Sequence, residues 1–429
     1  MKNQYLPRII DDVLDEYLDA FGAVLIVGPK WCGKTTSAEQ AAASIIKLQD
    51  RKRSRQYMMI AELNPAKLLE GEAPRLIDEW QMAPVLWDPV RDEVDERRQS
   101  GQFILTGSAV PKDDGISHTG TGRIGRLKMY PMSLFESEES NGRISLRDLF
   151  EGDADIDGIM SDLDIEHLAF AICRGGWPET VKKTGRSALL AAEGYIQALC
   201  ETDISRVDTT LRNPKRIRAI LRAYARNIST LAKKTSILAD VQANDMSFSS
   251  STFYEYLNVL QRLFVIEDIP AWSPAIRSKS AVRSGDKIGF TDPSLAAAAM
   301  GLTPERMLGD LESMGFYFEA LCIRDLRIYS QRLGGEVSYY HDRYGLESDC
   351  VLHLKDGRYA LIEVKLGGRQ IDEGAAHLLE LKALVQKYNQ SGKGSKLEEP
   401  TFLMVLTGGE FAYQRKDGVY VVPVGCLRD

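Results

Sequence analysis

The residues best suited to chemistry form a short glycine-rich stretch near the N-terminus. Gly28, Gly33, Lys34 and Thr35 follow the spacing G-x-x-x-x-G-K-T of a phosphate-binding loop. The glycines let the backbone curl so that N–H groups point at phosphate oxygens, and the lysine ammonium reaches the β- and γ-phosphates. The threonine hydroxyl suits Mg²⁺. We therefore predict a site for ATP and Mg²⁺ at Gly28, Pro29, Lys30, Trp31, Cys32, Gly33, Lys34, Thr35 and Thr36.

Two adjacent acids further along the chain fit the same chemistry. Asp78 and Glu79 come directly after the apolar pair Leu76 and Ile77. In proteins with a phosphate-binding loop, an acid at this place completes the Mg²⁺ shell, and the next acid polarises the attacking water. We assign Asp78 to the metal and Glu79 to the general base.

A third polar group follows the apolar run at residues 103–105. Thr106 and Ser108 stand where a side chain can touch the γ-phosphate or the water, although an ordinary strand-ending turn explains them too.

Beyond these residues, glycines precede two arginines, Arg123 and Arg126. This pattern suggests a mobile loop that presents a guanidinium to the nucleotide of a neighbouring subunit. A solvated basic loop is the alternative.

The elements that must position these groups are short strands and a helix. Residues 23–27 form a buried type of apolar run, and the glycine-rich turn and a helix follow it. The helix begins at the turn, so its positive dipole end faces the phosphates. We predict an α/β fold in which polar residues follow the ends of buried strands.

Several segments in this order resemble a known family. The segments "GPKWCGKT", "LIDEWQ", "ILTGSA", "GRIGRLKMYPMSLFE" and "RGGWPE" are similar to those of bacterial AAA+ ATP-binding proteins that carry a C-terminal domain of unknown function. The resemblance covers nearly the whole chain. It implies an AAA+ core with a helical lid, a winged-helix-like middle and a tail similar to the PD-(D/E)xK nuclease fold. It also favours a homo-oligomer, with a hexamer as the expected form.

The middle of the chain is basic although the whole protein is acidic. Residues 206–287 hold 14 Lys and Arg against 7 Asp and Glu, while the full chain carries a net charge of −7. Helical patterns at residues 212–229 and 249–263 precede two strand-like runs, 264–272 and 287–292, which a basic loop joins. This is the order of a winged helix, so duplex or branched DNA is the expected partner. A protein-binding module or a rigid spacer fits the same order.

The tail contains a second group of residues suited to chemistry. A helical run carrying Glu319 precedes strand-like runs, in which Asp349 opens one strand and Glu363-x-Lys365 ends the next. Residues two apart on a strand share a face. Asp349 and Glu363 would bind Mg²⁺, and Lys365 would position the attacking water or steady charge on a phosphate. An E-x-K pair is also an ordinary surface ion pair, and cleavage by this tail stays uncertain.

The composition limits the remaining choices. The 429 residues are 44% hydrophobic and contain no apolar run long enough to span a bilayer. Six scattered Cys form no C-x-x-C pair, which indicates a reducing cytoplasm.

Taken together, these patterns predict three domains, at residues 1–202, 203–300 and 301–429. We expect them to form an ATPase that acts on DNA. The alternative is an ATP-dependent switch or scaffold that binds a protein partner and has an inactive tail.

Overall fold

The chain divides into two compact units. The computed structural model describes residues 5–108, 120–204, 212–243, 245–273, 285–342, 344–391 and 396–429. The first unit is built mainly from Met1–Pro131, and the second mainly from Met132–Asp203, Arg212–Tyr256 and Ile266–Asp429. Residues 132–202, which we expected in the N-terminal domain, group with the C-terminal part of the chain.

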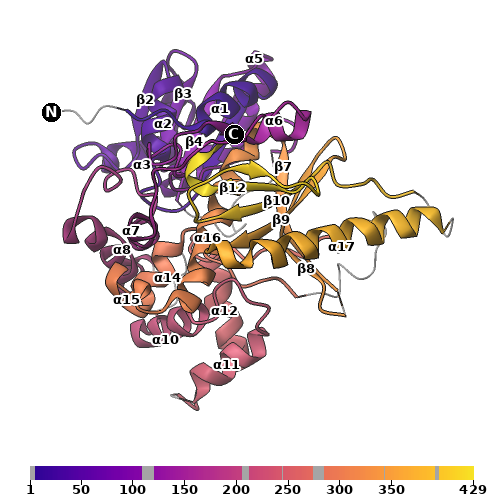
Figure 1. The fold of residues 1–429 in the computed structure, drawn as a ribbon. Coiled ribbons are helices and arrows are strands. Elements are labelled where there is room, and N and C mark those ends of the chain that lie inside the picture. Colours follow the sequence, from indigo (N-terminus) through magenta and orange to yellow (C-terminus); the bar gives the residue numbers. More distant parts are fainter. Residues whose placement is uncertain are drawn as a thin grey trace. The chain divides into compact units, whose positions relative to one another are not determined.

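The first unit contains a parallel five-stranded sheet of order β2-β3-β4-β1-β5. Figure 1 labels three of its strands, β2, β3 and β4. Its strands are β1 (Ala23–Val27), β2 (Ser44–Lys47), β3 (Arg75–Asp78), β4 (Phe103–Gly107) and β5 (Ile124–Lys128). Its helices are α1 (Ile9–Ala20), α2 (Lys34–Ala41), α3 (Ser54–Leu63), α4 (Ala66–Leu69) and α5 (Trp87–Arg97), with 3₁₀ turns at Trp80–Met82 and Pro84–Leu86.

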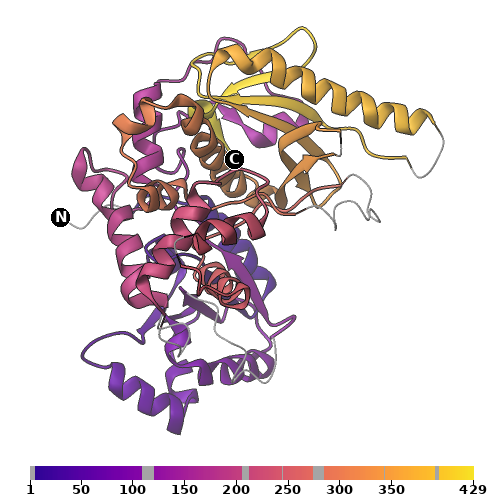
Figure 2. The ribbon, with the colours of Figure 1, turned by 90° about the horizontal axis from the view of Figure 1, so that it is seen from below.

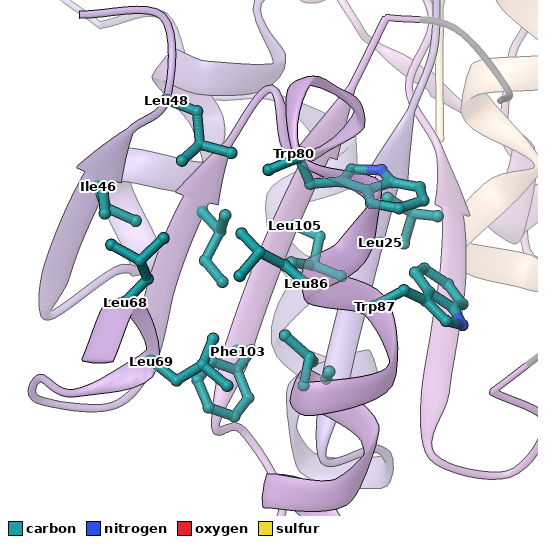
Figure 3. Close-up of a cluster of buried hydrophobic side chains, with 14 of the residues drawn as sticks. Leu25, Ile46, Leu48, Leu68, Leu69, Trp80, Leu86, Trp87, Phe103 and Leu105 are labelled. Atoms are coloured by element: carbon teal, nitrogen blue, oxygen red, sulfur yellow. The ribbon is translucent and has the colours of Figure 1, made fainter. Parts of the chain in front are cut away.

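Helices cover both faces of this sheet. On one face, Leu25 and Leu105 pack with Trp87 of α5 and with Leu68 and Leu69 of α4 (Figure 3). On the other face, the alternate strand residues pack against α1 and α2. Strands that are buried on both sides carry continuous apolar runs instead of alternating ones. This requirement explains why the strands expected at 23–27 and 103–105 could be located in the sequence.

The second unit contains most of the helices. They are α6 (Leu146–Glu151), α7 (Ile165–Arg174), α8 (Arg186–Ala198), α10 (Pro214–Ala225), α11 (Lys234–Gln242), α14 (Pro293–Met300), α15 (Pro304–Leu308), α16 (Leu311–Tyr329) and α17 (Ile371–Gln390). Helix α12 (Ser250–Arg262) has residues in both units. Short helical turns lie at Leu199–Asp203, Gln331–Leu333, Gly368–Gln370 and Val424–Cys426.

A six-stranded mixed sheet, of order β11-β12-β10-β9-β8-β7, forms the rest of the second unit. Its strands are β7 (Gly335–His341), β8 (Glu347–Leu354), β9 (Tyr359–Lys365), β10 (Phe402–Thr407), β11 (Tyr413–Gln414) and β12 (Tyr420–Pro423). Strands β7, β8 and β9 are antiparallel neighbours, whereas β10 runs parallel to β9. The short strands β6 (Ile144–Ser145) and β13 (Leu427–Arg428) pair separately.

Two helices hold this sheet in place. Helix α17 lies along it, with Ala375, Leu378 and Leu381 in one apolar cluster with strand residues such as Val351 and Leu361 (Figure 2). Helix α16 packs against β7, β8 and β9 and is buried from Tyr317 to Tyr329, although Leu311 and Phe316 near its start are exposed. Helix α16 lies in the segment around Glu319 for which the sequence pattern predicted a helix.

A buried ion network anchors α16. The guanidinium of Arg324 lies 2.9 Å from Asp292 and 2.7 Å from Asp325, and all three side chains are almost fully buried. Asp292 also accepts a hydrogen bond from the backbone N–H of Gly176, and Asp325 accepts one from that of Leu134. Buried charges need such partners. The network therefore fixes the helix that carries Glu319.

Short stretches of backbone hydrogen bonding join three segments in the middle of the chain, at residues 229–230, 266–269 and 287–290. Ile269 and Lys287 exchange two N–H···O bonds of 2.9 Å, and Ile288 bonds with Ser229 and Thr230. The strands expected at 264–272 and 287–292 are thus reduced to isolated bridges. The basic loop expected between them falls largely on residues 274–284, outside the described residues. Among the described helices, none combines the length and the apolar character that crossing a bilayer requires.

Two leucines near each other in sequence test the packing of the first unit. Leu69 is 1% exposed, whereas Leu63 is 79% exposed. We predict that Leu69→Ala lowers the free energy of unfolding by about 2–5 kcal/mol, because it leaves a cavity. Leu63→Ala should change it by less than about 0.5 kcal/mol. Urea denaturation followed by tryptophan fluorescence measures both, and equal losses would contradict this packing.

Candidate functional site

The glycine-rich loop lies between β1 and α2, and three of its residues have positive φ angles. Gly28 and Gly33 have φ angles of +156° and +103°, and Trp31 has a φ of +65°. A Cβ atom on Gly28 would lie 2.2 Å from the carbonyl oxygen of Met129, which is backbone and cannot move aside easily. The first glycine of the motif is therefore required by the close approach of the chain after β5.

Lys34 starts helix α2, and its ammonium lies inside the loop. Its Nζ donates hydrogen bonds to the carbonyl oxygens of Gly28 (2.9 Å) and Pro29 (2.7 Å), and its side chain is buried. Oxygens thus already surround this ammonium. Phosphate oxygens, which carry more charge than carbonyls, would be stronger acceptors for the same donor.

Three segments converge on the carboxylate of Asp78 at the end of β3. Its Oδ1 accepts a hydrogen bond from Thr35 (2.6 Å) and another from Thr106 (2.7 Å), while Oδ2 lies 3.4 Å from the side-chain nitrogen of Gln49. Asp78 is fully buried. The structure therefore brings together the two residues predicted to hold Mg²⁺ and one of the two residues predicted at the end of β4.

Glu79 lies beside them in an unusual conformation. Its φ of +58° lies in the left-handed region, which disfavours residues with a Cβ atom. Its backbone N–H donates to Thr106 Oγ1 (3.1 Å), and its carboxylate accepts from Ser108 (3.1 Å) and from Gln81. All residues predicted at the strand ends therefore belong to one hydrogen-bonded array.

The two candidate arginines lie elsewhere in the first unit. Arg126 belongs to strand β5 and not to a loop as expected, because its neighbours Ile124 and Leu127 are buried in the sheet. Arg123 precedes β5 and pairs with Asp95 at 3.0 Å. Strand β5 runs parallel to β1, with Ile124 beside Ala23 and Lys128 beside Val27. Arg123 is therefore at the end of the sheet opposite the loop that follows Val27.

Sequence reasoning missed a buried arginine that supports the loop. Arg8 donates hydrogen bonds of 2.9 Å to the carbonyl oxygens of Cys32, inside the loop, and Tyr130, after β5. Nearby, Tyr5 bonds with Ser37 of α2. A cationic residue before an apolar helix was the only signal in the sequence, and it carries no distance information.

The first-unit residues fit a nucleotide with Mg²⁺. The left-handed glycine of the loop, the lysine inside it and the threonine next to a buried carboxylate supply the phosphate donors and the oxygen ligands that such a ligand needs. Thr35 and Asp78 would hold the metal ion, and Lys34 would bind the phosphates.

The tail residues also lie together, in the second unit. Lys365 Nζ is 2.6 Å from Glu363 and 3.7 Å from Asp349. Lys287, which sequence reasoning did not select, lies 2.6 Å from Glu319 and 3.4 Å from Asp349. We name these five side chains the carboxylate–lysine cluster. They come from the hairpin at residue 287, from α16, from β8 and from β9.

Burial and neighbouring charges shift the pKa values of the three acids of this cluster in different directions. Burial, strengthened by the negative charge of Asp349, raises the pKa of Glu363 to about 9. Burial also raises the pKa of Glu319 to about 7, against the pull of Lys287. Burial opposes ionisation of Asp349 as well, but Lys287 and Lys365 outweigh it and lower the pKa. Glu363 therefore holds a proton more readily than Asp349, whose charge lies between the two lysines.

A divalent cation does not fit this arrangement. Among the described residues, no three His, Cys, Asp or Glu side chains lie as a group that could hold a metal ion. The ammonium of Lys287 lies instead between Glu319 and Asp349. The roles predicted for Asp349, Glu363 and Lys365 stay predictions, although the three residues do meet.

Comparison with protein families finds a match for most of the first unit and two matches in the rest of the chain. Residues 20–138 match a family model described as "AAA domain", residues 165–306 match "Domain of unknown function (DUF8612)", and residues 314–427 match "Domain of unknown function (DUF4143)". No curated protein matches the chain. The chain thus contains a region that matches an AAA domain, followed by two regions that match domains of unknown function.

Solved structures show weaker likeness. The Walker-type ATPase paby2304 of Pyrococcus abyssi is 14% identical, with 70% of this chain and 97% of that chain covered and a TM-score of 0.45. The Hef helicase domain of Pyrococcus furiosus is 10% identical, with 94% and 89% covered and a TM-score of 0.20. Both scores are too low to support an argument about function.

The left-handed backbone at Glu79 leads to a prediction with an unusual sign. Glycine normally makes a folded protein less stable than alanine does. At Glu79 we expect Glu79→Gly to be more stable than Glu79→Ala by about 0.5–1 kcal/mol, because only glycine adopts the left-handed conformation without strain. Both variants lose the carboxylate, so chemical denaturation compares the backbone alone. A more stable alanine variant would show that Glu79 is not held in this conformation.

Proposed function

We propose that this protein binds and hydrolyses ATP at the loop of its first unit and uses that reaction to act on DNA. The observation that carries the first half is the array in which Thr35 and Thr106 share one oxygen of buried Asp78. A Mg²⁺ ion bound there would neutralise charge on the phosphates. Lys34 binds the β- and γ-phosphates, and Thr106 orients Asp78.

Glu79 acts as the general base in this proposal. Ser108 and Gln81 donate to its carboxylate and set its orientation, and Thr106 accepts its backbone N–H. These contacts hold the carboxylate at the end of β4, next to the Asp78 array, where it can accept a proton from the attacking water. The strain at Glu79 fits a residue that is held in place for function.

The order of elements in the middle of the chain supports the DNA half of the proposal. Helix α10, the pair Ser229–Thr230, helices α11 and α12, and the bridged segments at 266–269 and 287–290 follow the order of a winged helix. Lys215, Arg218 and Arg222 are exposed on α10, and Arg226 is exposed directly after it. Tyr254 is exposed on α12, so it is available to stack on bases, whereas Tyr256 is buried.

Paired charges favour the second candidate, an ATP-dependent switch that binds a protein. Arg216 pairs with Asp245, Lys234 with Asp268, and Arg218 with Glu201 at 3.6 Å. Basic groups that already have acidic partners attract phosphates less.

The order α16, β7, β8, β9, α17, β10 supports a tail of the PD-(D/E)xK type, but we propose no cleavage step there.

We further propose that the active form is a homo-oligomer. Arg123 and Arg126 are exposed, and Arg123 lies at the end of the sheet opposite the loop of its own chain, so it would reach only the nucleotide of a neighbouring subunit. Light scattering with ATP present measures the mass of the particle. A monomer at all protein concentrations that hydrolyse ATP would refute this part.

The lysine of the loop gives the direct test of ATP hydrolysis. We predict that Lys34→Ala lowers phosphate release by about 100-fold or more, because the ammonium stabilises charge on the transferred phosphoryl group. Lys67→Ala, which removes an exposed lysine of α4, should hydrolyse ATP like the native chain. Unchanged turnover in Lys34→Ala would contradict the assignment of the site.

Nucleic acid added to the same assay separates the two candidates. If the protein acts on DNA, single-stranded, duplex or branched DNA raises ATP turnover several-fold, and the rise weakens as salt increases because phosphate contacts release counterions. Turnover that no DNA changes at low salt would reject the DNA half and favour a protein partner, while leaving the ATPase assignment intact.

A further inference from the structure

The positive charges in the carboxylate–lysine cluster are the ammonium groups of two lysines of the chain, Lys287 and Lys365. Lys287 and Lys365 both approach Asp349, at 3.4 Å and 3.7 Å, and each makes a closer contact of 2.6 Å with Glu319 and Glu363, respectively. Three acids from α16, β8 and β9 thus face two ammonium groups in the interior of the second unit. Lys287 is 6% exposed, so its charge depends on these acids for solvation.

The position of Lys287 is the one that a metal ion would need. A divalent cation binds between carboxylate oxygens, at about 2.0–2.6 Å from each. Here the Lys287 ammonium lies between an oxygen of Glu319 and one of Asp349. An ammonium and a divalent cation repel each other and compete for the same oxygens, so both cannot occupy this place.

Glu363 shows that the cluster is incompletely satisfied. Its side chain is fully buried, and its Oε1 has no hydrogen-bond partner among the described residues. Leaving such an oxygen without a donor or a cation is costly. A cavity of about 480 Å³, lined in part by Lys287, Glu319, Asp349 and Lys365, reaches the cluster and gives an ion access to it.

The backbone fixes where the Lys287 ammonium lies. Lys287 and Ile269 exchange two hydrogen bonds of 2.9 Å, and the next residue, Ile288, bonds with Thr230 at 2.9 Å. The ammonium therefore leaves the cluster only if this hairpin shifts or the lysine rotates away. The occupant is supplied by the segment before α14, and the acids belong to α16 and the sheet.

We propose that Lys287 is a built-in occupant of the cation position in this cluster. While it is in place, the native chain binds no divalent cation at Glu319, Asp349 and Glu363. Removal of the ammonium creates a site for one divalent cation such as Mn²⁺ or Mg²⁺. This inference concerns the second unit alone and does not depend on ATP hydrolysis.

The test counts Mn²⁺ bound to the full chain without nucleotide, from the electron paramagnetic resonance signal of free Mn²⁺. We expect Lys287→Met to bind one more Mn²⁺ than the native chain, and Lys287→Met combined with Asp349→Asn to lose it. Lys287→Arg should bind no extra ion, because it keeps the positive charge. Lys234→Met, which removes another paired lysine of the second unit, is the matched control and should behave as the native chain.

Two outcomes would overturn the proposal. One is a folded Lys287→Met variant, verified by circular dichroism, that binds no more Mn²⁺ than the native chain. The other is a native chain that binds a Mn²⁺ ion which Asp349→Asn removes. The second arm uses only the native chain and Asp349→Asn, so the proposal can be overturned even if Lys287→Met does not fold.

Discussion

The shared oxygen of Asp78 is the contact on which the first unit's site depends. A carboxylate that is removed from water is costly unless hydrogen-bond donors surround it, and here two hydroxyls from different segments bind the same atom. Because Thr35 lies in the first turn of α2 and Thr106 lies near the end of β4, this atom joins the loop, the central strands and the array around Glu79. The parallel order β3-β4-β1 makes the convergence possible, since it brings the carboxyl ends of these strands to one edge.

The second unit also contains buried carboxylates, but their partners are positively charged side chains instead of hydroxyls. Its carboxylates are balanced by ammonium and guanidinium groups, in the carboxylate–lysine cluster and in the network around Arg324. Such pairs are often retained for the geometry they impose, because burying two charges yields little net stability. In this protein they fix α16 against the sheet and join it to the hairpin at Lys287. The carboxylate–lysine cluster therefore serves as a structural joint between α16, the sheet and the segment at Lys287.

The sequence was most informative where chemistry demands short-range spacing. Lys34 and Thr35 follow from one local motif, and the buried strands follow from continuous apolar runs. Arg8 and Lys287 could not be found in this way, because their partners are remote: Tyr130 is 122 residues from Arg8, and Asp349 is 62 residues from Lys287. Arg126 was expected in a loop because glycines precede it, yet sheet packing of Ile124 and Leu127 places it in β5. Local composition could not reveal that long-range pairing.

The affinity of the protein for ATP with and without Mg²⁺ tests the central claim most directly. Titration calorimetry on the native chain and on Asp78→Asn, which keeps the shape of the side chain, isolates the charge of that one group. The account predicts that Mg²⁺ tightens ATP binding to the native chain by about 10-fold or more, and that Asp78→Asn binds ATP with little dependence on Mg²⁺. Equal dependence on Mg²⁺ in both proteins, or no ATP binding by the native chain, would contradict it.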